Sequence, residues 1–413
     1  MSLDNINLYL KGDNGIGTAL NVCEELDNIE ITELINAEIN LEELILKLSS
    51  RSLDGVKVNS KVNDLIDKLW QSLNNEEECV ENMIKVIEPL LIKKPRLTEK
   101  QKRLKGLNPK LGFSLGEDDI YEEWKRKGGI ESIPICFVIL KHLKISQISK
   151  NLWWIIPFIF NLLDDTSDLH GVRMPAVLLL RTMLNSIFYE QHSDKWMAFK
   201  DTGLFEEYEN MLVNFCFYLP PSYDAAETLK IWETVIPTIQ VLYKTQYIQD
   251  TARQKMHIQK FLGEVILQNC LLRCGCKYEN LTTYLLRTIR VGFSYLGEDS
   301  IALLQRLIYD MGQYLIKDPF FTAFEPLMHE VTCTIEYTIQ ANNEKRIIAH
   351  KYDFLGLILL IYGKLKFEEQ EKSIVMEELR DIVGMLNKIG CNFNEDIQHL
   401  KDINDIDYSQ LLL

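Results

Sequence analysis

Two apolar runs joined by a short polar turn, between Leu152 and Phe188, constrain the fold of this chain more than any other feature. The first run ends at Leu162-Leu163-Asp164-Asp165, and the second follows Val172-Arg173-Met174-Pro175-Ala176. Apolar positions in both runs recur every three or four residues, which is typical of helices with one buried face. The segment predicts a helical hairpin. Such a hairpin cannot bury its own apolar face, so other helices must pack on it.

The turn of this hairpin resembles the HEAT repeat, in which acidic residues end the first helix and a Val-Arg-x-x-Ala pattern begins the second. We expect the carboxylate of Asp165 or Asp168 to accept hydrogen bonds from the free amides of the second helix. Arg173 is expected to bridge to a neighbouring hairpin. Asp164 and Asp165 are better explained as caps than as a catalytic pair, because adjacent helical residues point about 100° apart. The sequence therefore predicts an all-α fold, an α-solenoid of HEAT-like helical hairpins.

Composition along the chain suggests three regions. Residues 1–92 predict an N-terminal helical region, with helices over residues 31–35, 41–46, 61–73 and 76–91 and a connection over residues 50–60. Residues 93–120 predict a basic linker or exposed loop, since 93–110 carry eight Lys and Arg against one acid. A weak localisation signal is the alternative for this stretch. Residues 121–413 form the predicted solenoid.

Prolines stand at or near the front of several apolar runs. The clearest are Pro134, Pro157 and Pro237, each preceded by an isoleucine and followed within two residues by another isoleucine. Proline is tolerated in the first turn of a helix and kinks the helix further in. Each proline is therefore predicted to begin or bend a helix.

The charge and cysteine content argue against several classes of protein. A net charge of -15 repels nucleic acid and anionic membranes, so we expect no direct binding to either. Nine cysteines without a paired framework, and no export-type start, predict free thiols and a location in the cytoplasm and nucleus. The most apolar runs, Leu152–Phe160 and Phe354–Gly363, are shorter than the ~20 residues of a membrane span.

No motif predicts catalysis, a cofactor or a metal. The glycines between Gly12 and Gly17 lack the Lys-Ser/Thr pair of a phosphate-binding loop and predict a turn. Cys270, Cys274 and Cys276 lack the second ligand pair of a zinc site and are expected to be buried small hydrophobic residues. The seven histidines have no paired spacing that would place two ligands on one helix face. We therefore expect no enzyme.

Two aromatic segments are either binding anchors or core. Trp153 and Trp154 are adjacent in an apolar run, where at least one ring is expected to be buried. Tryptophan is also enriched at binding hot spots. The segment Asn214–Pro221 has the same two interpretations, and the core is favoured for it.

Several blocks between Tyr121 and Pro319 together resemble the Tti-type family of Tel-two-interacting protein two, a subunit of the Triple-T (TTT) cochaperone complex. Glu123-Trp124-Lys125-Arg126-Lys127-Gly128-Gly129 is similar to its fungal branch. Pro175-Ala176 departs from the family pattern, in which a glycine is expected. The positions that carry the resemblance are Trp124, Gly128, Gly129, Trp153, Pro157, Leu163, Asp164, Asp165, Arg173, Gly203, Leu204, Leu219, Pro220, Gly297 and Pro319.

This resemblance implies a helical-repeat adaptor that binds the other, first Tti-type subunit of the complex. It also implies an indirect role, with heat-shock chaperone machinery, in maturing phosphatidylinositol-kinase-related kinases. Telomere maintenance, DNA-damage signalling and growth control would depend on that role. A fungal member would further be expected in the chromatin-associated ASTRA assembly. A permanent interface of this kind should bury more than ~2,000 Å².

Two other classes of function remain open from the sequence. A transport-receptor-like solenoid would bind cargo transiently, and weak, salt-sensitive binding controlled by a small nucleotide-loaded regulator would favour it. A cryptic enzyme would need titratable groups that converge in a cleft, and a structure showing only packed helix pairs would count against it.

Overall fold

The computed structural model describes residues 4–12, 16–28, 31–54, 56–92, 118–189, 198–368, 374–403 and 406–411. These residues form helices and turns with no strand among them, which confirms the predicted all-α fold. No helix within these ranges has both the length and the apolarity needed to cross a membrane. The chain divides into two compact units, residues 1–202 and 203–413.

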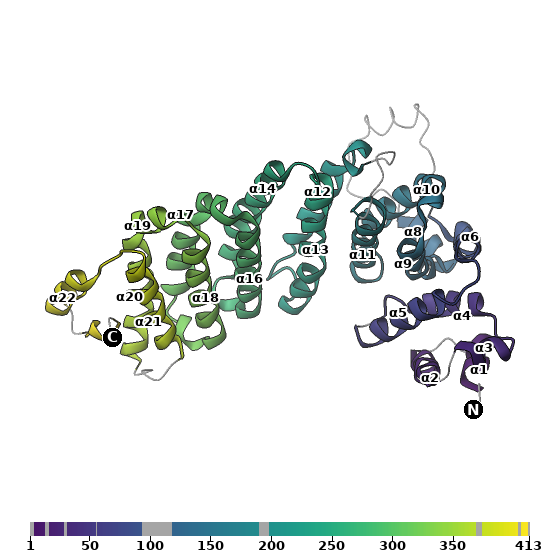
Figure 1. Ribbon diagram of the computed structural model, residues 1–413, viewed down its shortest axis with the longest axis horizontal. Coiled ribbons are helices and arrows are strands. Elements are labelled where there is room, and N and C mark those ends of the chain that lie inside the picture. The colour runs from purple at the N-terminus through teal and green to yellow at the C-terminus, as the bar shows by residue number, and fades with distance from the viewer. Residues whose placement is uncertain are drawn as a thin grey trace. The chain divides into compact units, whose positions relative to one another are not determined.

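The first unit runs from purple to teal in Figure 1 and joins short N-terminal helices to a packed group of longer ones. Its elements are α1 (Asp4–Lys11), α2 (Ile16–Asp27), α3 (Ile31–Asn36), α4 (Leu41–Ser49), α5 (Val56–Trp70), α6 (Glu76–Ile87), η1 (Glu88–Leu90), α8 (Asp118–Arg126), η2 (Gly129–Glu131), α9 (Ser132–His142), α10 (Ile145–Leu163), η3 (Leu169–Arg173), α11 (Met174–Met183), η4 (Leu184–Tyr189) and η5 (Phe199–Thr202).

The structure has a helix at each of the four places predicted in residues 31–91, but the third helix begins earlier than expected. Helix α5 begins at Val56, so the connection predicted over residues 50–60 is shorter than expected. Asn40 and Asn75 cap α4 and α6, because their side chains accept hydrogen bonds from the first free amides of each helix. The basic stretch 93–110 and residues 13–15 of the glycine cluster lie outside the described residues.

Helix α9 is the centre of the first unit, since it contacts α4, α6 and α11. Its Cys136, Ile139 and Leu140 are fully buried. Helices α10 and α11 form the predicted hairpin, joined by a short turn and the π-helical segment η3. The hairpin thus buries its apolar faces against other helices, as its sequence predicted.

The second unit is a row of paired helices, coloured teal to yellow in Figure 1. Its elements are α12 (Phe205–Cys216), α13 (Ala225–Gln246), α14 (Thr251–Lys260), η6 (Phe261–Leu271), α15 (Leu272–Cys274), η7 (Cys276–Tyr278), α16 (Glu279–Leu296), η8 (Gly297–Ser300), α17 (Ile301–Asp310), η9 (Met311–Ile316), η10 (Phe321–Ala323), α18 (Glu325–Ala341), α19 (Glu344–Ala349), α20 (Lys351–Phe367), α21 (Ile374–Lys388), α22 (Asn394–Ile403) and η11 (Ser409–Leu411).

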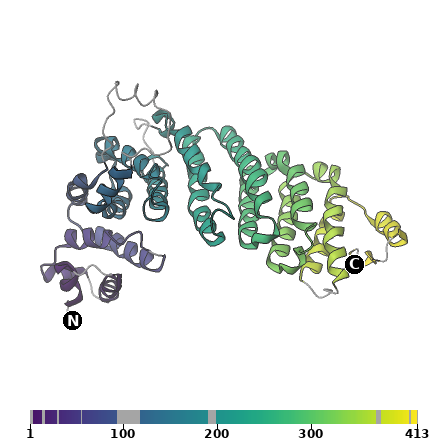
Figure 2. The ribbon, with the colours of Figure 1, turned by 180° about the vertical axis from the view of Figure 1, so that it is seen from behind.

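These pairs form two layers, which are visible from both sides in Figures 1 and 2. In one layer, here called the inner layer, α13 contacts α16, α16 contacts α18, and α18 contacts α21. The other, outer layer contains α12, α14 with η6, α17 with η9, and α20, and successive members again contact one another. Each pair therefore packs mainly against its neighbours, which is the arrangement of a helical solenoid.

Polar bonds repeat between successive inner-layer helices. The Tyr284 hydroxyl of α16 donates to the Trp232 carbonyl of α13 at 3.1 Å. Arg287 and Arg290 of α16 both donate to the buried carboxylate of Glu330 on α18, with a distance of 2.8 Å for Arg287. Glu378 of α21 in turn accepts from Thr332 of α18. A charge-assisted or side-chain bond thus links each inner helix to the next.

The outer layer differs from the inner one in its helical geometry. Segments η6 and η9 are π-helical continuations of α14 and α17, whereas α13, α16, α18 and α21 are α-helical throughout. A π-turn carries one more residue than an α-turn and is frequent at functional sites.

The prolines occupy both of the predicted kinds of position. Pro134 lies in the first turn of α9, and Pro175 begins α11. Pro157 and Pro237 lie inside α10 and α13, where each removes one backbone donor. The placement at the front of an apolar run therefore did not mark the start of these two helices.

Residues 406–411 dock on the end of the second unit. Tyr408 and Leu411 are buried, and the Tyr362 hydroxyl of α20 donates to the Asp407 carbonyl at 3.0 Å. Arg380 of α21 donates to the Gln410 carbonyl at 3.0 Å. This segment covers apolar surface of the last helix pair.

Candidate interaction surfaces

The turn of the α10–α11 hairpin is capped by Asp168 and not by Asp165. The Asp168 carboxylate accepts a hydrogen bond from the Gly171 amide at 2.7 Å. Asp165 is fully buried, and its Oδ1 accepts from the amide and hydroxyl of Ser167 at 2.8 and 2.7 Å. Of the two predicted caps, the structure supports Asp168, while Asp165 shapes the turn itself. Asp164, exposed, ends α10.

Lys125 of α8 connects an upstream motif to this turn. Its Nζ donates to Ser167 Oγ at 2.9 Å and lies 3.7 Å from a carboxylate oxygen of both Asp165 and Asp168. Asp165 Oδ2 is buried without a hydrogen bond, so the Lys125 charge is what compensates it. Asp165 of the family motif, together with Asp168, therefore forms an ionic junction with Lys125 between α8 and the hairpin.

Arg173 also acts inside the hairpin. Its Nε donates to the carbonyl of Leu163, a fully buried residue in the last turn of α10, at 3.0 Å. This bond satisfies a carbonyl that the helix end leaves open. The bond joins the two helices of one hairpin, and the bridge to a neighbouring hairpin stays a prediction.

Trp124, Gly128 and Gly129 form one packed unit. The Trp124 indole Nε1 donates to the Leu90 carbonyl of η1 at 2.6 Å, and the side chain is 6% exposed. A Cβ at Gly129 would lie 2.2 Å from the indole, and Gly128 has φ +79°, which favours glycine. The two glycines therefore let the chain turn directly over the Trp124 ring.

The remaining motif positions lie at separate turns. Gly203 and Gly297 have φ of 68° and 59°, and Gly297 ends α16 by donating its amide to Phe293. Leu204 precedes α12, and Leu219 is buried before the half-buried Pro220, whose bond to Pro221 is cis. Pro319 is exposed in the loop after η9. These residues shape the path of the chain, and the structure does not gather them into one site.

Trp153 is the motif residue with the character of a binding anchor. Its side chain is 71% exposed on α10, whereas Trp154 is buried and donates to Asn151 Oδ1 at 2.8 Å. This confirms that at least one of the two rings is core. Pro157 is exposed one turn beyond Trp153, and Ile156 and Phe160 on the same side are half-buried. We call these four residues the α10 surface.

The cysteines are free, and all but Cys333 are buried. Burial raises the pKa of the Cys274 and Cys276 thiols to about 12, and burial likewise raises the pKa of Cys270. These thiols are protonated and shielded at neutral pH, as buried hydrophobic residues would be. Within the described residues, no cluster of His, Cys, Asp and Glu has a metal-binding arrangement.

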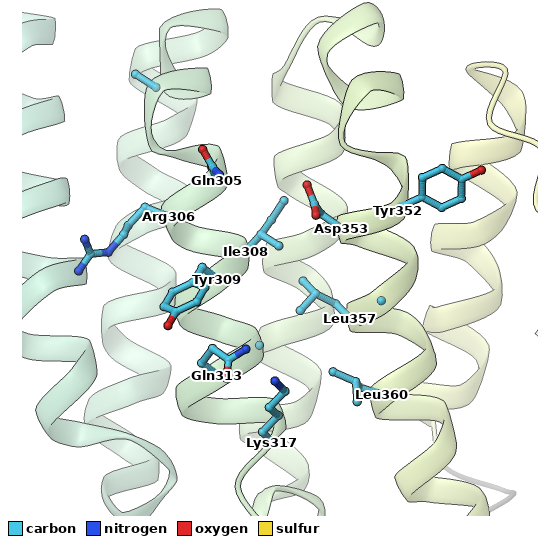
Figure 3. A pocket seen from close by; sticks show the side chains of 13 residues that line it. Gln305, Arg306, Ile308, Tyr309, Gln313, Lys317, Tyr352, Asp353, Leu357 and Leu360 are labelled. Carbon is cyan, nitrogen blue, oxygen red and sulfur yellow. The ribbon is translucent and has the colours of Figure 1, made fainter.

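A groove between α17–η9 and α20 is the second candidate surface, and the sequence did not reveal it. Its volume is about 690 Å³. Figure 3 shows Tyr309 and Tyr352 on its two rims, with Ile308, Leu357 and Leu360 between them. Glycines in the middle of helical runs, Gly312 and Gly356, were the signal that could have indicated it.

Comparison with known proteins gives a consistent result. The Tti2 family model matches residues 45–323. TEL2-interacting protein 2 of Saccharomyces cerevisiae is 38% identical over 371 residues, which cover 89% of this chain and 88% of the relative. No solved structure matches.

Proposed function

The chain belongs to the Tti2 family, and from this premise we propose that it is a non-enzymatic adaptor subunit of the Triple-T complex. The observation that carries the proposal is the match to TEL2-interacting protein 2 along 89% of the chain. Because the match also covers 88% of the relative, the two proteins are alike over nearly their whole lengths.

The structure supports an adaptor in two ways. The described residues are stacked helices whose thiols are buried except at Cys333, and the acids singled out at the hairpin turn, Asp165 and Asp168, cap the turn or pair with Lys125. Exposed aromatic side chains stand on α10 and on the rims of the α17–α20 groove, and aromatic residues are enriched where proteins bind one another. These surfaces suit a protein that binds other proteins.

The finer part of the proposal names the partners. We propose that the first Tti-type subunit is the main direct partner, in a complex that also contains the Tel-two protein. Through chaperone machinery, the complex would support phosphatidylinositol-kinase-related kinases, and a fraction would join the ASTRA assembly. These roles place the chain in both the cytoplasm and the nucleus.

Purification of the tagged full-length chain from its own cells tests this proposal. We expect two large helical proteins, the first Tti-type subunit and the Tel-two protein, to co-purify in near-equal amounts and to withstand 0.5 M salt. An obligate interface is largely apolar, so high salt should weaken it little. Recovery of the chain alone would refute the adaptor role.

A transport-receptor-like function is the alternative, because solenoids of this kind also present broad surfaces. It predicts several partners in low amounts, lost in high salt and released by a nucleotide-loaded regulator. The same purification, repeated at two salt concentrations, separates the two functions.

A further inference from the structure

Gly356 is the residue of the groove that most needs an explanation. It lies in the middle of α20, and a Cβ built on it would meet no heavy atom within 4 Å. Glycine inside a helix costs about 1 kcal/mol relative to alanine. No atom of this chain fills the space that a Cβ on Gly356 would enter. The α20 backbone at this residue is therefore accessible to another molecule.

Gly312 is a second glycine of the groove and lies in η9, opposite α20. A Cβ on Gly312 would lie 3.0 Å from the Leu357 side chain, so here glycine allows η9 and α20 to approach each other. Gly312 and Gln313 belong to the π-helical segment η9. The groove is therefore lined by a π-turn on one side and by open backbone on the other.

The floor and rims have different chemistry. Leu357 is buried and Leu360 is exposed between the walls, whereas Tyr309 and Tyr352 are 55% and 59% exposed on the rims (Figure 3). Large aromatic side chains beside an apolar floor are typical of grooves that hold an amphipathic helix. From Gln305 to Lys317 the wall spans about 18 Å, which fits roughly three turns of such a helix.

The charges at the two ends of the groove are opposite. Figure 3 shows Asp353 and Gln305 at its upper end and Lys317 at its lower end. Arg306 points away from the groove and is paired with the buried Asp310 at 3.0 Å. Lys317 has no ion-pair partner within the described ranges, while Asp353 has only His350 beside it, at 2.9 Å. The groove thus has an acidic and a basic end.

We propose that this groove holds an amphipathic helix of a partner protein, lying antiparallel to α17 and α20. Helices commonly carry acidic residues in the first turn and basic residues in the last. An acidic first turn beside Lys317 and a basic last turn beside Asp353 fix the direction. The helix presents a small residue to Gly356 and aliphatic residues to Leu357 and Leu360. This inference rests on the proposed function, because it requires a partner that the adaptor holds.

Photo-crosslinking in the full complex tests both the helix and its direction. Benzoylphenylalanine is placed at Gln305 or Gln313, at two levels of the groove, and at Gln340 on the inner-layer helix α18 as control. The two groove positions are about 12 Å apart along the wall. Both should crosslink to one segment of one partner, with the residue trapped from Gln313 preceding that trapped from Gln305 by about eight residues.

Other outcomes overturn the proposal. An extended peptide would give a separation of about four residues, and a parallel helix would reverse the order. Crosslinks from the two positions to unrelated segments, or none from either, show that the groove is not a helix site. Co-purification of the partners is scored separately, so a failed groove with partners still bound leaves the adaptor role intact.

Filling the groove gives a second, independent test. Gly356→Leu should reduce the groove crosslinks at least tenfold without lowering the melting temperature, because its side chain enters open space. Gly384→Leu in α21 is the matched control, since a Cβ there also meets nothing within 4 Å. Gly356→Ala should retain most crosslinks. Unchanged crosslinking in Gly356→Leu would disprove occupancy of the groove at this residue.

Discussion

The two units of the molecule hold their helices together in different ways. In the second unit, each inner-layer helix contacts the next, and similar polar bonds recur from α13 to α21. In the first unit, α9 contacts helices from three parts of the chain, and single side chains such as Trp124 and Lys125 join loops to helices. Stability is thus distributed along one unit and concentrated in the other.

The largest expected effect comes from placing a charge in either core. Leu179 of α11 and Leu286 of α16 are both fully buried, so each Leu→Asp change should cost more than about 4 kcal/mol. In Leu179→Asp, we expect amide protection to be lost throughout residues 118–189. In Leu286→Asp, the loss should be confined to α13–α18. Hydrogen exchange with mass spectrometry measures both, and equally wide loss in the two variants would contradict the comparison.

Trp124 tests how far the first unit depends on one side chain. Trp124→Ala should cost about 3–5 kcal/mol, since it removes a buried ring and its bond to the Leu90 carbonyl. Gly129→Ala should also destabilise, because its methyl group would overlap the indole. In the double variant the overlap is gone, so the two costs should not add. Thermal unfolding of the three variants measures this coupling, and strict additivity would argue against it.

Glu330 is the corresponding test in the second unit. Glu330→Gln should cost about 2 kcal/mol, because the bonds from Arg287 and Arg290 lose their charge assistance. Arg287→Gln is the control. It should cost less than about 1 kcal/mol, since Arg287 is mostly exposed and Arg290 remains. Denaturant unfolding measures the free energy of unfolding of both variants. Equal losses would mean that Glu330 is not the group on which the two arginine bonds depend.

Asp168→Ala should have a smaller effect, about 1 kcal/mol, through loss of the cap on the hairpin turn. Asp168→Asn should be nearly neutral, because asparagine caps equally well. Melting temperatures of the two variants decide the point. Equal losses would assign the effect to the Lys125 charge pair instead of the cap.

The smallest effect expected is a pH dependence in the first unit. Burial opposes ionisation of Asp67, but His142, whose Nε2 lies 3.1 Å from Asp67 Oδ1, and hydrogen bonds from Lys141 hold the pKa of its carboxyl below the usual value. A lowered pKa in the folded state stabilises the fold at neutral pH, and this contribution is lost as the pH falls below about 4. Asp67→Asn should therefore flatten the acid limb of a stability curve. An unchanged limb would remove Asp67 from this role.

The apolar spacing in the sequence was sufficient to predict the paired helices, because burial of one face determines where Leu and Ile must recur. It could not predict which acid caps the hairpin. Asp165 and Asp168 both lie in the turn, and only the backbone path places one carboxylate beside the Gly171 amide. The exposed Trp153 and buried Trp154 were likewise indistinguishable as neighbours in one apolar run.

The groove was missed for a related reason. Tyr309 and Tyr352 are 43 positions apart in the sequence, and no local pattern indicates that α17 and α20 are adjacent. Gly356 was visible, but a glycine in a helix indicates a close approach without saying what approaches. Gly356 lines a groove only because α17 and η9 pack beside α20 in the folded outer layer.

The π-turns of the outer layer have a consequence for how this chain tolerates changes in length. A π-turn contains one more residue than an α-turn. The helical segments before and after it can therefore direct their side chains as they would if that residue were absent. Deleting one residue within 311–316 would leave Tyr309 and Lys317 on the same side as before, whereas a deletion inside α16 would rotate all that follows by about 100°. We therefore expect the outer layer to accept the loss of one residue at a π-turn more readily than the α-helical inner layer does.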